Sequence, residues 1–287
     1  MADQKSGMQE PASHSDLLLG KRLEYTDTYS PQLLFPIARA QARQLLLINS
    51  AFDLPLPFHG QDLWTAYELS WLDVQGKPQV AMAEFSIPAD SPNIIESKSF
   101  KYYLNSLNQS RFKSWEAVSE ILAADLSSAA GAEVAVELYS LNREAVLTTH
   151  IPGVCVDELD VGNPVYQPDP SLLRIEAGPQ TVSGALYSHL LKTNCPVTGQ
   201  PDWATLWVQY SGPRIDAASF LAYVVSFRQH QDFHENCVEK IFCDLQNQCH
   251  AKELTVYARY TRRGGLDINP FRTNSGLPVP QWRLPRQ

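Results

Sequence analysis

The same succession of elements is predicted twice along this chain, and that repeat constrains the fold more than any other feature. Each half contains two predicted strands, two amphipathic helices and a further strand. Two pairs of stretches match: Phe85-Ser-Ile-Pro88 with Tyr210-Ser-Gly-Pro213, and Glu133-Val-Ala-Val136 with Glu253-Leu-Thr-Val256. The offset is about 120 to 125 residues, so an internal duplication is the economical explanation.

The repeat divides the chain into four predicted segments. These are an irregular, proline-rich lead-in (1–60), a first module (61–150), a linker (151–180) and a second module (181–287). Strands alternating with helix pairs in each module predict the α+β class.

Helix starts are predicted from capping residues. Ser97 or Ser99 is expected to cap the first helix, whose apolar residues follow at helical spacing: Phe100, Tyr103, Leu104 and Leu107. Ser114 and Asp216 are expected to cap two further helices.

Composition excludes several classes of protein. The 287 residues carry a formal charge of −8, which disfavours a dedicated nucleic-acid binder. No apolar run approaches the length of a membrane span, and Met1–Ser15 lacks the apolar core of a secretory signal. Five cysteines, an odd number without dense spacing, indicate free thiols in a reducing compartment. We therefore expect a cytoplasmic protein with no membrane or direct nucleic-acid partner.

One stretch, Asn194–Trp203, places a thiol and a carboxyl group close together. Cys195 and Asp202 are separated by residues that favour turns: Pro196, Gly199 and Pro201. The stretch is predicted to be a stiff loop, neither helix nor strand. It holds either a nucleophile with its proton donor or a proline-glycine turn that happens to contain a cysteine.

The two halves carry different reactive groups. Cys195 aligns roughly with Glu68–Trp71, where the first half has no thiol, and the cluster Glu96–Ser99 has no expected counterpart near Asp216–Ser219. This division suggests one site built from both halves. His234 and Glu235 open a predicted helix, where they are either site residues or an ordinary polar first turn.

Two further groups are candidates for ligand binding. Arg259, Arg262 and Arg263 precede Gly264 and Gly265, a combination that suits a phosphorylated ligand or a basic surface turn. Cysteines recur every six residues on a predicted helix, but their side chains point about 240° apart and do not form a metal site; they are Cys237, Cys243 and Cys249.

Four motifs together resemble the family of NADPH-dependent 7-cyano-7-deazaguanine reductases, the nitrile reductases of the queuosine pathway, in their longer two-module form. They are Glu96-Ser-Lys-Ser-Phe-Lys-Tyr-Tyr-Leu-Asn105, Cys195-Pro-Val-Thr-Gly-Gln-Pro-Asp-Trp203, Phe233-His-Glu235 and Tyr257-Ala-Arg-Tyr-Thr-Arg-Arg-Gly-Gly-Leu-Asp-Ile-Asn-Pro270. The resemblance implies tandem tunnelling-fold (T-fold) modules, each an antiparallel sheet with two helices on one face. It also implies a homodimer.

The same resemblance implies roles for individual residues. Cys195 would add to the nitrile carbon to give a thioimide, Asp202 would supply the proton, and His234 would border the nitrile. The deazapurine would be bound by Ile95, Glu96, Ser97, His234 and Glu235. NADPH would be bound by Ser97, Lys98, Arg263 and Gly264, and no metal is expected.

Three other functions remain open at this point. A zinc-dependent cyclohydrolase on the same fold would need a ligand set such as His230, His234 and His250 converging near Cys195. A cysteine hydrolase would release acid and ammonia without oxidising a cofactor. A base-binding or tRNA-binding module would not depend on the thiol.

Overall fold

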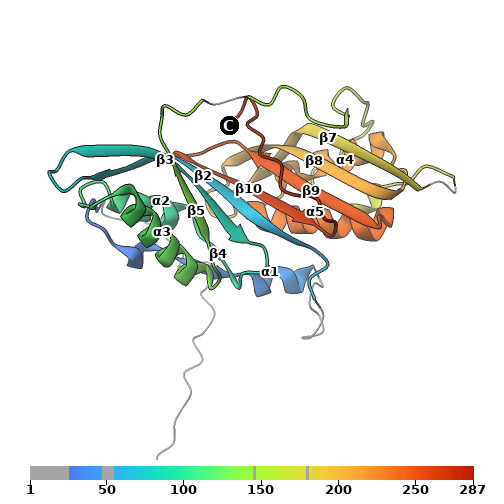
Figure 1. Cartoon of the computed structure of the whole chain (residues 1–287). Helices are drawn as coiled ribbons and strands as arrows, with labels where there is room; N and C mark the ends of the chain where they lie inside the picture. The colour runs from blue at the N-terminus through green and yellow to red at the C-terminus, as the bar shows by residue number, and fades with distance from the viewer. Residues whose placement is uncertain (1–25, 47–54, 145–146, 179–180) are drawn as a thin grey trace, which may run out of the picture.

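A computed structural model describes residues 26–46, 55–144, 147–178 and 181–287 (Figure 1). The segment Met1–Ser15, where no secretory signal was expected, lies outside the described residues. The strands are β1 (Pro36–Ala38), β2 (His59–Leu72), β3 (Pro78–Pro88), β4 (Asn93–Ile95), β5 (Ala135–Tyr139), β6 (Val154–Cys155), β7 (Thr181–Asn194), β8 (Pro201–Pro213), β9 (Glu253–Tyr260) and β10 (Leu266–Thr273). The helices are α1 (Arg39–Leu45), α2 (Ser97–Ser106), α3 (Trp115–Ala130), α4 (Ala217–Ser226) and α5 (His234–Cys249).

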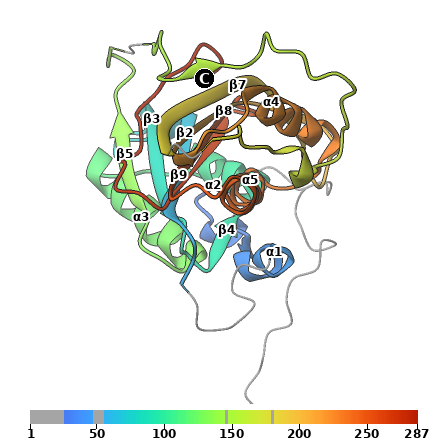
Figure 2. The same cartoon turned by 90° about the vertical axis from the view of Figure 1, so that its right-hand side faces the viewer.

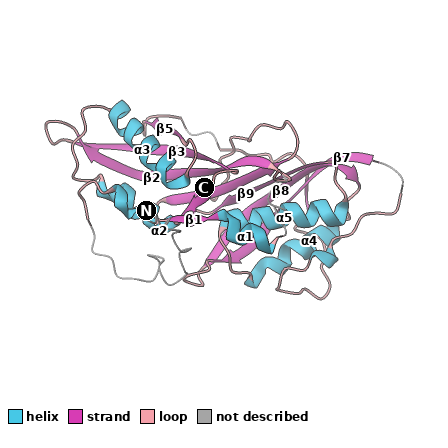
Figure 3. Cartoon of the chain, turned by 90° about the horizontal axis from the view of Figure 1, so that it is seen from below, coloured by secondary structure: helices cyan, strands magenta, loops and turns pink. Residues whose placement is uncertain are grey.

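Eight of these strands form one continuous sheet in the order β5-β3-β2-β10-β9-β8-β7-β6. The helices cover one face of this sheet, as Figure 1 and the view from below in Figure 3 show. Strand β6 pairs parallel with β7, and the other neighbours are antiparallel. The α+β class is confirmed. The strands of the two halves join in this one sheet.

Strand β10 joins the two halves. It pairs with β2 from Leu266↔Ala66 to Thr273↔His59, and with β9 only over its last three residues. A strand from the C-terminal segment therefore completes the sheet of the N-terminal half. Seen end-on in Figure 2, the helices of both halves lie on the same side of the twisted sheet.

The duplication is confirmed in detail. Strands β2 and β7 are both 14 residues long and have a register shift at the same place, between Ala66 and Leu69 and between Ser188 and Leu191. Helices α2 and α4 both have 10 residues, and α3 and α5 both have 16.

The repeat also extends into segments expected to be irregular. The lead-in contains α1, β1 and a 3₁₀ turn, Pro31–Leu33, whose counterpart Pro170–Leu172 lies in the expected linker. The first turn is attached to α2 and the second to α4. In each case the hydroxyl group of the last residue of the helix, a serine, accepts the hydrogen bond. Ser106 accepts from a backbone N–H at 3.1 Å, and Ser226 does so at 3.4 Å. Elements of three residues are too short to show a periodic pattern.

Each half packs its helices on its part of the sheet to form a core. The predicted stripe of α2, which begins with Phe100 and Tyr103, is buried against β2 and β3. In the second half, alternate residues of β9 such as Val256 and Tyr260 pack against α4 and α5. The predicted caps Ser114 and Asp216 are confirmed. No helix in the described part of the chain has the length and apolar character needed to cross a bilayer.

A buried cluster of charges ties four elements together. Arg272 of β10 binds Asp62 of β2 at 2.8 Å and Glu239 of α5 at 2.9 Å. From α1, Arg39 binds Asp62 at 2.6 Å and Arg43 binds Glu239 at 2.8 Å. These side chains are at most 8% exposed, so each charge depends on its partners for the solvation that it has lost.

Removing one member of this cluster should be costly. We expect Arg272→Ala to lower the free energy of unfolding by about 3–5 kcal/mol, because it leaves buried carboxylates short of a partner. The exposed pair Arg214–Glu176 offers a control, and Arg214→Ala should cost less than about 1 kcal/mol. Urea denaturation measures both, and equal effects would show that the buried cluster does not hold the halves together.

Candidate active site

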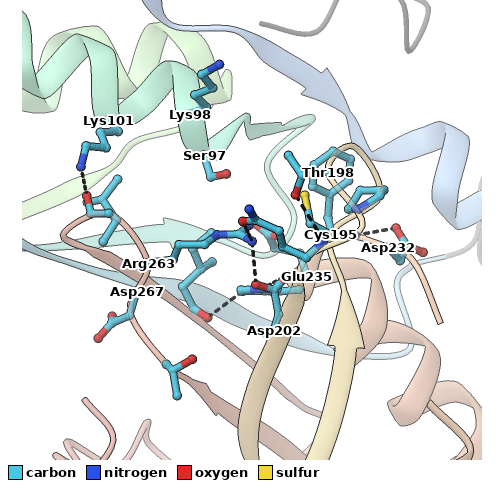
Figure 4. Close-up of a pocket in the computed structure, with 18 of the residues that line it drawn as sticks. Ser97, Lys98, Lys101, Cys195, Thr198, Asp202, Asp232, Glu235, Arg263 and Asp267 are labelled. Atoms are coloured by element: carbon cyan, nitrogen blue, oxygen red, sulfur yellow. Dashed lines mark hydrogen bonds and ion pairs between the residues drawn. The ribbon is translucent and has the colours of Figure 1, made fainter. Parts of the chain in front are cut away.

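A pocket lies between the two halves, at the end of the sheet where a hairpin connects β7 to β8. Ser97, Lys98 and Lys101 come from α2 on one side, and the turn holding Cys195 and the loop holding Arg263 lie on the other (Figure 4). Nine of the ten residues predicted for the site line this pocket: Ile95, Ser97, Lys98, Cys195, Asp202, His234, Glu235, Arg263 and Gly264.

The stretch around Cys195 is a tight hairpin and not a long loop. Asn194 ends β7 and Pro201 begins β8, so Asp202 is a strand residue paired with Thr193. The prediction that Asn194–Trp203 lacks strand structure is therefore wrong at both ends. A hairpin between paired strands holds the thiol and the carboxyl group more rigidly than a free loop does.

Comparing the two halves shows which residue of the first half occupies the position of Cys195. Its N–H donates to the Gln200 carbonyl at 2.9 Å, and its carbonyl accepts from Gly199 at 3.0 Å. In the first half, Asp73 makes the same two backbone contacts, with Lys77 and Gly76, at 2.9 Å each. Cys195 thus corresponds to Asp73 and not, as expected, to a residue of Glu68–Trp71.

The Cys195 thiol is buried, with 4% of its surface exposed. Burial alone raises its pKa, but hydrogen bonds from the Thr198 side chain, from the backbone of Thr198 and Val197, and from Arg263 outweigh burial and lower the pKa. A lowered pKa increases the thiolate fraction at neutral pH, and the thiolate is the nucleophilic form. The turn residues of the hairpin thereby activate the sulfur.

Asp202 lies between two basic side chains. One carboxylate oxygen is 3.4 Å from His234 Nε2 and the other is 3.3 Å from Arg263 Nη1. The residue is only 7% exposed. This arrangement fixes both oxygens and leaves the carboxyl group facing the pocket that also contains Cys195.

The His234 ring is held on three sides. Besides Asp202, its Nδ1 lies 3.3 Å from the Ile268 carbonyl oxygen, and the ring stacks on Tyr260 at 3.6 Å with planes 4° apart. Sequence reasoning missed Tyr260 as a support of the site, because its pattern marks it only as an inward-facing strand residue. His234 opens α5 as predicted.

Glu235 is buried beside the charge cluster. Loss of water on burial and the nearby negative charge of Asp62 raise its pKa to about 7, although Arg39 and His234 lower it in part. Its side chain lines the pocket with 2% of the residue exposed. A carboxyl group titrating near neutrality can either accept or donate a hydrogen bond to a ligand.

Glu96 is the one predicted residue that does not line the pocket. It is fully buried, and its carboxylate caps α2 by accepting from the N–H groups of Lys98 at 2.9 Å and Ser99 at 2.7 Å. Glu96 therefore takes the capping role expected for Ser97 or Ser99. Its counterpart in the second half, Asp216, caps α4 in the same way.

Comparing α2 with α4 shows which residues at the start of α2 are repeated in the second half and which are not. Glu96 and Ser99 recur as Asp216 and Ser219, so the expectation that this cluster has no counterpart is wrong for half of it. The positions of Ser97 and Lys98 are occupied in α4 by two alanines. The two polar residues that line the pocket are thus the ones that differ between the halves.

Basic groups surround one end of the pocket. Lys101, which sequence reasoning missed, donates to the Gly264 carbonyl and lies 3.6 Å from Glu68. It follows Lys98 by three residues, so helical spacing could have identified it. Gly264 has φ of 62°, and a Cβ there would come within 3.0 Å of the lysine nitrogen. Of the three predicted arginines, only Arg263 lines this pocket.

The two other arginines lie on aromatic rings away from the pocket. Arg262 lies 4.6 Å from the centre of the Tyr67 ring, and Arg259 donates to the Tyr257 hydroxyl at 3.0 Å. No group of three potential metal ligands among the described residues includes Cys195 or the histidines His230, His234 and His250. The ligand set required by a zinc cyclohydrolase is therefore not assembled in the described part of the chain.

Comparisons with known proteins identify the family. A relative from Saccharophagus degradans, named NADPH-dependent 7-cyano-7-deazaguanine reductase, is 58% identical over 273 residues, which is 95% of this chain and all of the relative. A relative of the same name from Bordetella pertussis is 54% identical over 277 residues, 96% of this chain and all of the relative. This chain belongs to the NADPH-dependent 7-cyano-7-deazaguanine reductase family.

Matches to two family descriptions agree with this assignment. Residues 25–138 match "Nitrile reductase, 7-cyano-7-deazaguanine-reductase N-term", and residues 201–277 match "QueF-like protein". The crystal structure of an archaeosine synthase QueF-Like covers 36% of this chain at 16% identity with a TM-score of 0.30, a likeness too low to bear on the fold. The family resemblance inferred from the four motifs is confirmed.

The raised pKa of Glu235 predicts a stability cost at this site. Between its ordinary pKa of 4.5 and about 7, the folded chain keeps a proton that the unfolded chain has released, so rising pH destabilises the fold. We expect Glu235→Gln to raise the free energy of unfolding at pH 8 by on the order of 2 kcal/mol, and by much less at pH 5.

Glu116 provides the matched control, since it occupies the same place in α3 and is exposed. Glu116→Gln should not stabilise the chain at either pH. Urea denaturation at both pH values measures the effect. A Glu235→Gln variant that is no more stable than the parent at pH 8 would contradict the assigned pKa.

Proposed function

We propose that this chain reduces the nitrile of 7-cyano-7-deazaguanine to the aminomethyl group of 7-aminomethyl-7-deazaguanine, using NADPH, in the cytoplasmic synthesis of queuosine. The names of the relatives support the substrate and the cofactor. The observation that carries the proposal is the buried Cys195 thiol, whose pKa is lowered in a pocket that also contains Asp202 and Glu235.

The first step is addition of the Cys195 thiolate to the nitrile carbon. A carbon–sulfur bond forms, one π bond of the C≡N group breaks, and the nitrogen takes up a proton to give a thioimide. The lowered pKa of the thiol supports its role as nucleophile. The four-electron reduction is thereby divided into two two-electron steps. After the first step the carbon–sulfur bond breaks, which returns the Cys195 thiolate and leaves an imine for the second step, and the pocket would shield that imine from water.

Asp202 is the proposed proton donor to the nitrile nitrogen. It shares the pocket with Cys195 and is buried, and His234 at 3.4 Å can return a proton to it after each transfer. The stacking of His234 on Tyr260 supports this relay, because it restricts the ring to one orientation.

The residues at the basic end of the pocket fit a phosphorylated dinucleotide. Lys98, Lys101 and Arg263 supply positive charge for phosphate groups, and Ser97 lies at the first turn of α2, where the helix dipole favours an anion. When bound, NADPH supplies one hydride to the carbon at each of the two reduction steps. Gly264 lets the backbone approach such a ligand closely.

Glu235 is proposed to bind the guanine-like N–H edge of the substrate. Its buried carboxyl group faces the pocket, and a bidentate contact to two N–H groups is the geometry that a carboxylate favours. We further propose that the two halves are T-fold modules and that the chain acts as a homodimer. The repeated strand and helix lengths support the first of these statements.

Mass spectrometry tests the covalent step. Mixing the protein with the nitrile substrate in the absence of NADPH should raise the intact mass by the mass of the substrate, and Cys195→Ala should abolish the shift. Cys155→Ala removes an exposed free thiol and should leave the adduct intact. Adduct on the Cys195→Ala variant, or product formed without NADPH oxidation as in a cysteine hydrolase, would overturn the proposal.

Replacing Asp202 by Asn tests the proton donor. The amide keeps the shape of the side chain but does not deliver a proton, so kcat should fall by about 10²-fold or more while the dissociation constant of the substrate changes little. Asp160→Asn alters an exposed carboxylate and serves as the control. Turnover at the parental rate in Asp202→Asn would refute the assignment.

A further inference from the structure

Three potential metal ligands meet at the far edge of the sheet. Cys155 pairs with Tyr187 in the parallel β6–β7 ladder, and this register continues so that Asp157 lies beside His189. Ligand atoms of Cys155, Asp157 and His189 lie close to one another at this edge. His189 lies within the register shift of β7 between Ser188 and Leu191, and its side chain is exposed.

Distances within this cluster are close to those of a metal site. One ligand atom from each of Cys155, Asp157 and His189 lies within 4.8 Å of the other two. Zinc bonds of about 2.0–2.3 Å place ligand atoms roughly 3.3–3.7 Å apart in a tetrahedron. The side chains therefore need to close by about one ångström. Cys155 and His189 are exposed and Asp157 is half-buried, which leaves them room to do so.

Neighbouring groups already orient two of the ligands. The Asp157 carboxylate accepts from the His189 N–H at 3.0 and 3.2 Å, and His189 Nδ1 lies 2.9 Å from the Thr205 hydroxyl. Outer-shell contacts of this kind fix the ring and the carboxylate at protein metal sites. Arg286 donates to the same hydroxyl at 3.3 Å. Its positive charge lies near Asp157 and would repel a bound cation, so the ligands must outweigh that repulsion.

The arrangement does not suit a catalytic triad. Asp157 holds the backbone N–H of His189 and not its ring, and the ring contacts Thr205. None of the three cluster residues lines the pocket around Cys195. His189 lies on β7 and precedes Cys195, which follows the end of that strand, by six positions; six residues of extended chain span about 20 Å.

We propose that Cys155, Asp157 and His189 form a binding site for a zinc ion. A thiolate, an imidazole and a carboxylate are a donor set that zinc accepts, and water completes the tetrahedron. Zinc at this position ties the two-residue edge strand β6 to β7. The site is independent of the proposed reductase activity, because it shares no residue with the pocket.

Titration with zinc chloride tests the site. The protein carries Cys195→Ala throughout, so that the pocket thiol does not bind the metal, and is freed of metal by chelator and dialysis. Calorimetry should detect one zinc ion per chain. Cys155→Ala, Asp157→Asn and His189→Gln should each weaken the binding at least tenfold. His59→Gln, which alters an exposed histidine at the start of β2, should not.

Cobalt(II) provides a second readout, because a thiolate ligand gives a sulfur-to-cobalt charge-transfer band in the near ultraviolet. The band should appear in the Cys195→Ala protein and vanish when Cys155 is also replaced. Zinc should raise the melting temperature of the Cys195→Ala protein but not that of the variant in which Cys155 is also replaced. Equal zinc affinity with and without Cys155, or loss of binding in His59→Gln, would overturn the proposal.

Discussion

The pairing of β10 with both β2 and β9 is the interaction on which the rest of the structure depends. It turns two duplicated halves into one sheet and brings α2 of the first half opposite the β7–β8 hairpin of the second. Arg272 of β10 reinforces this junction by binding carboxylates from both halves in the protein interior. Because the pocket lies at the junction, neither half holds a complete site.

Duplication also explains how the site could arise without loss of the fold. Groups that maintain each half occur twice: Tyr103 donates to Asp125 at 2.6 Å, and Tyr223 donates to Asp244 at 2.6 Å. Several groups that line the pocket occur once: Cys195 stands where the first half has Asp73, and Ser97 and Lys98 stand where the second half has alanines. The two halves therefore share structural contacts and differ in several of the groups that line the pocket.

Much of this could be predicted from the sequence, and the misses have physical causes. Periodic apolar patterns and local caps predicted the main helices, since those signals lie within a few residues of each other. The single sheet could not be predicted, because it depends on the pairing of β10 with β2, whose partners lie 200 or more residues apart in the sequence. Glu96 was assigned to the pocket on resemblance, whereas its carboxylate satisfies the N terminus of α2.

The pKa values at the site likewise depend on folding. Sequence reasoning selected Cys195 and Glu235, but not the hydrogen bonds and burial that move their pKa values toward neutrality from opposite sides. Tyr260 was missed because it acts through His234, a neighbour brought close only by the fold. Lys101 was missed although it follows Lys98 at helical spacing on α2.

A crystal structure of the Cys195→Ala variant with 7-cyano-7-deazaguanine and NADP⁺ tests the composite site most directly. The account predicts the nitrile carbon next to position 195, the base edge on Glu235 and phosphate groups between Lys98 and Arg263, with both halves of one chain touching the ligands. Ligands bound by one half alone, or a nitrile turned away from position 195, would contradict it.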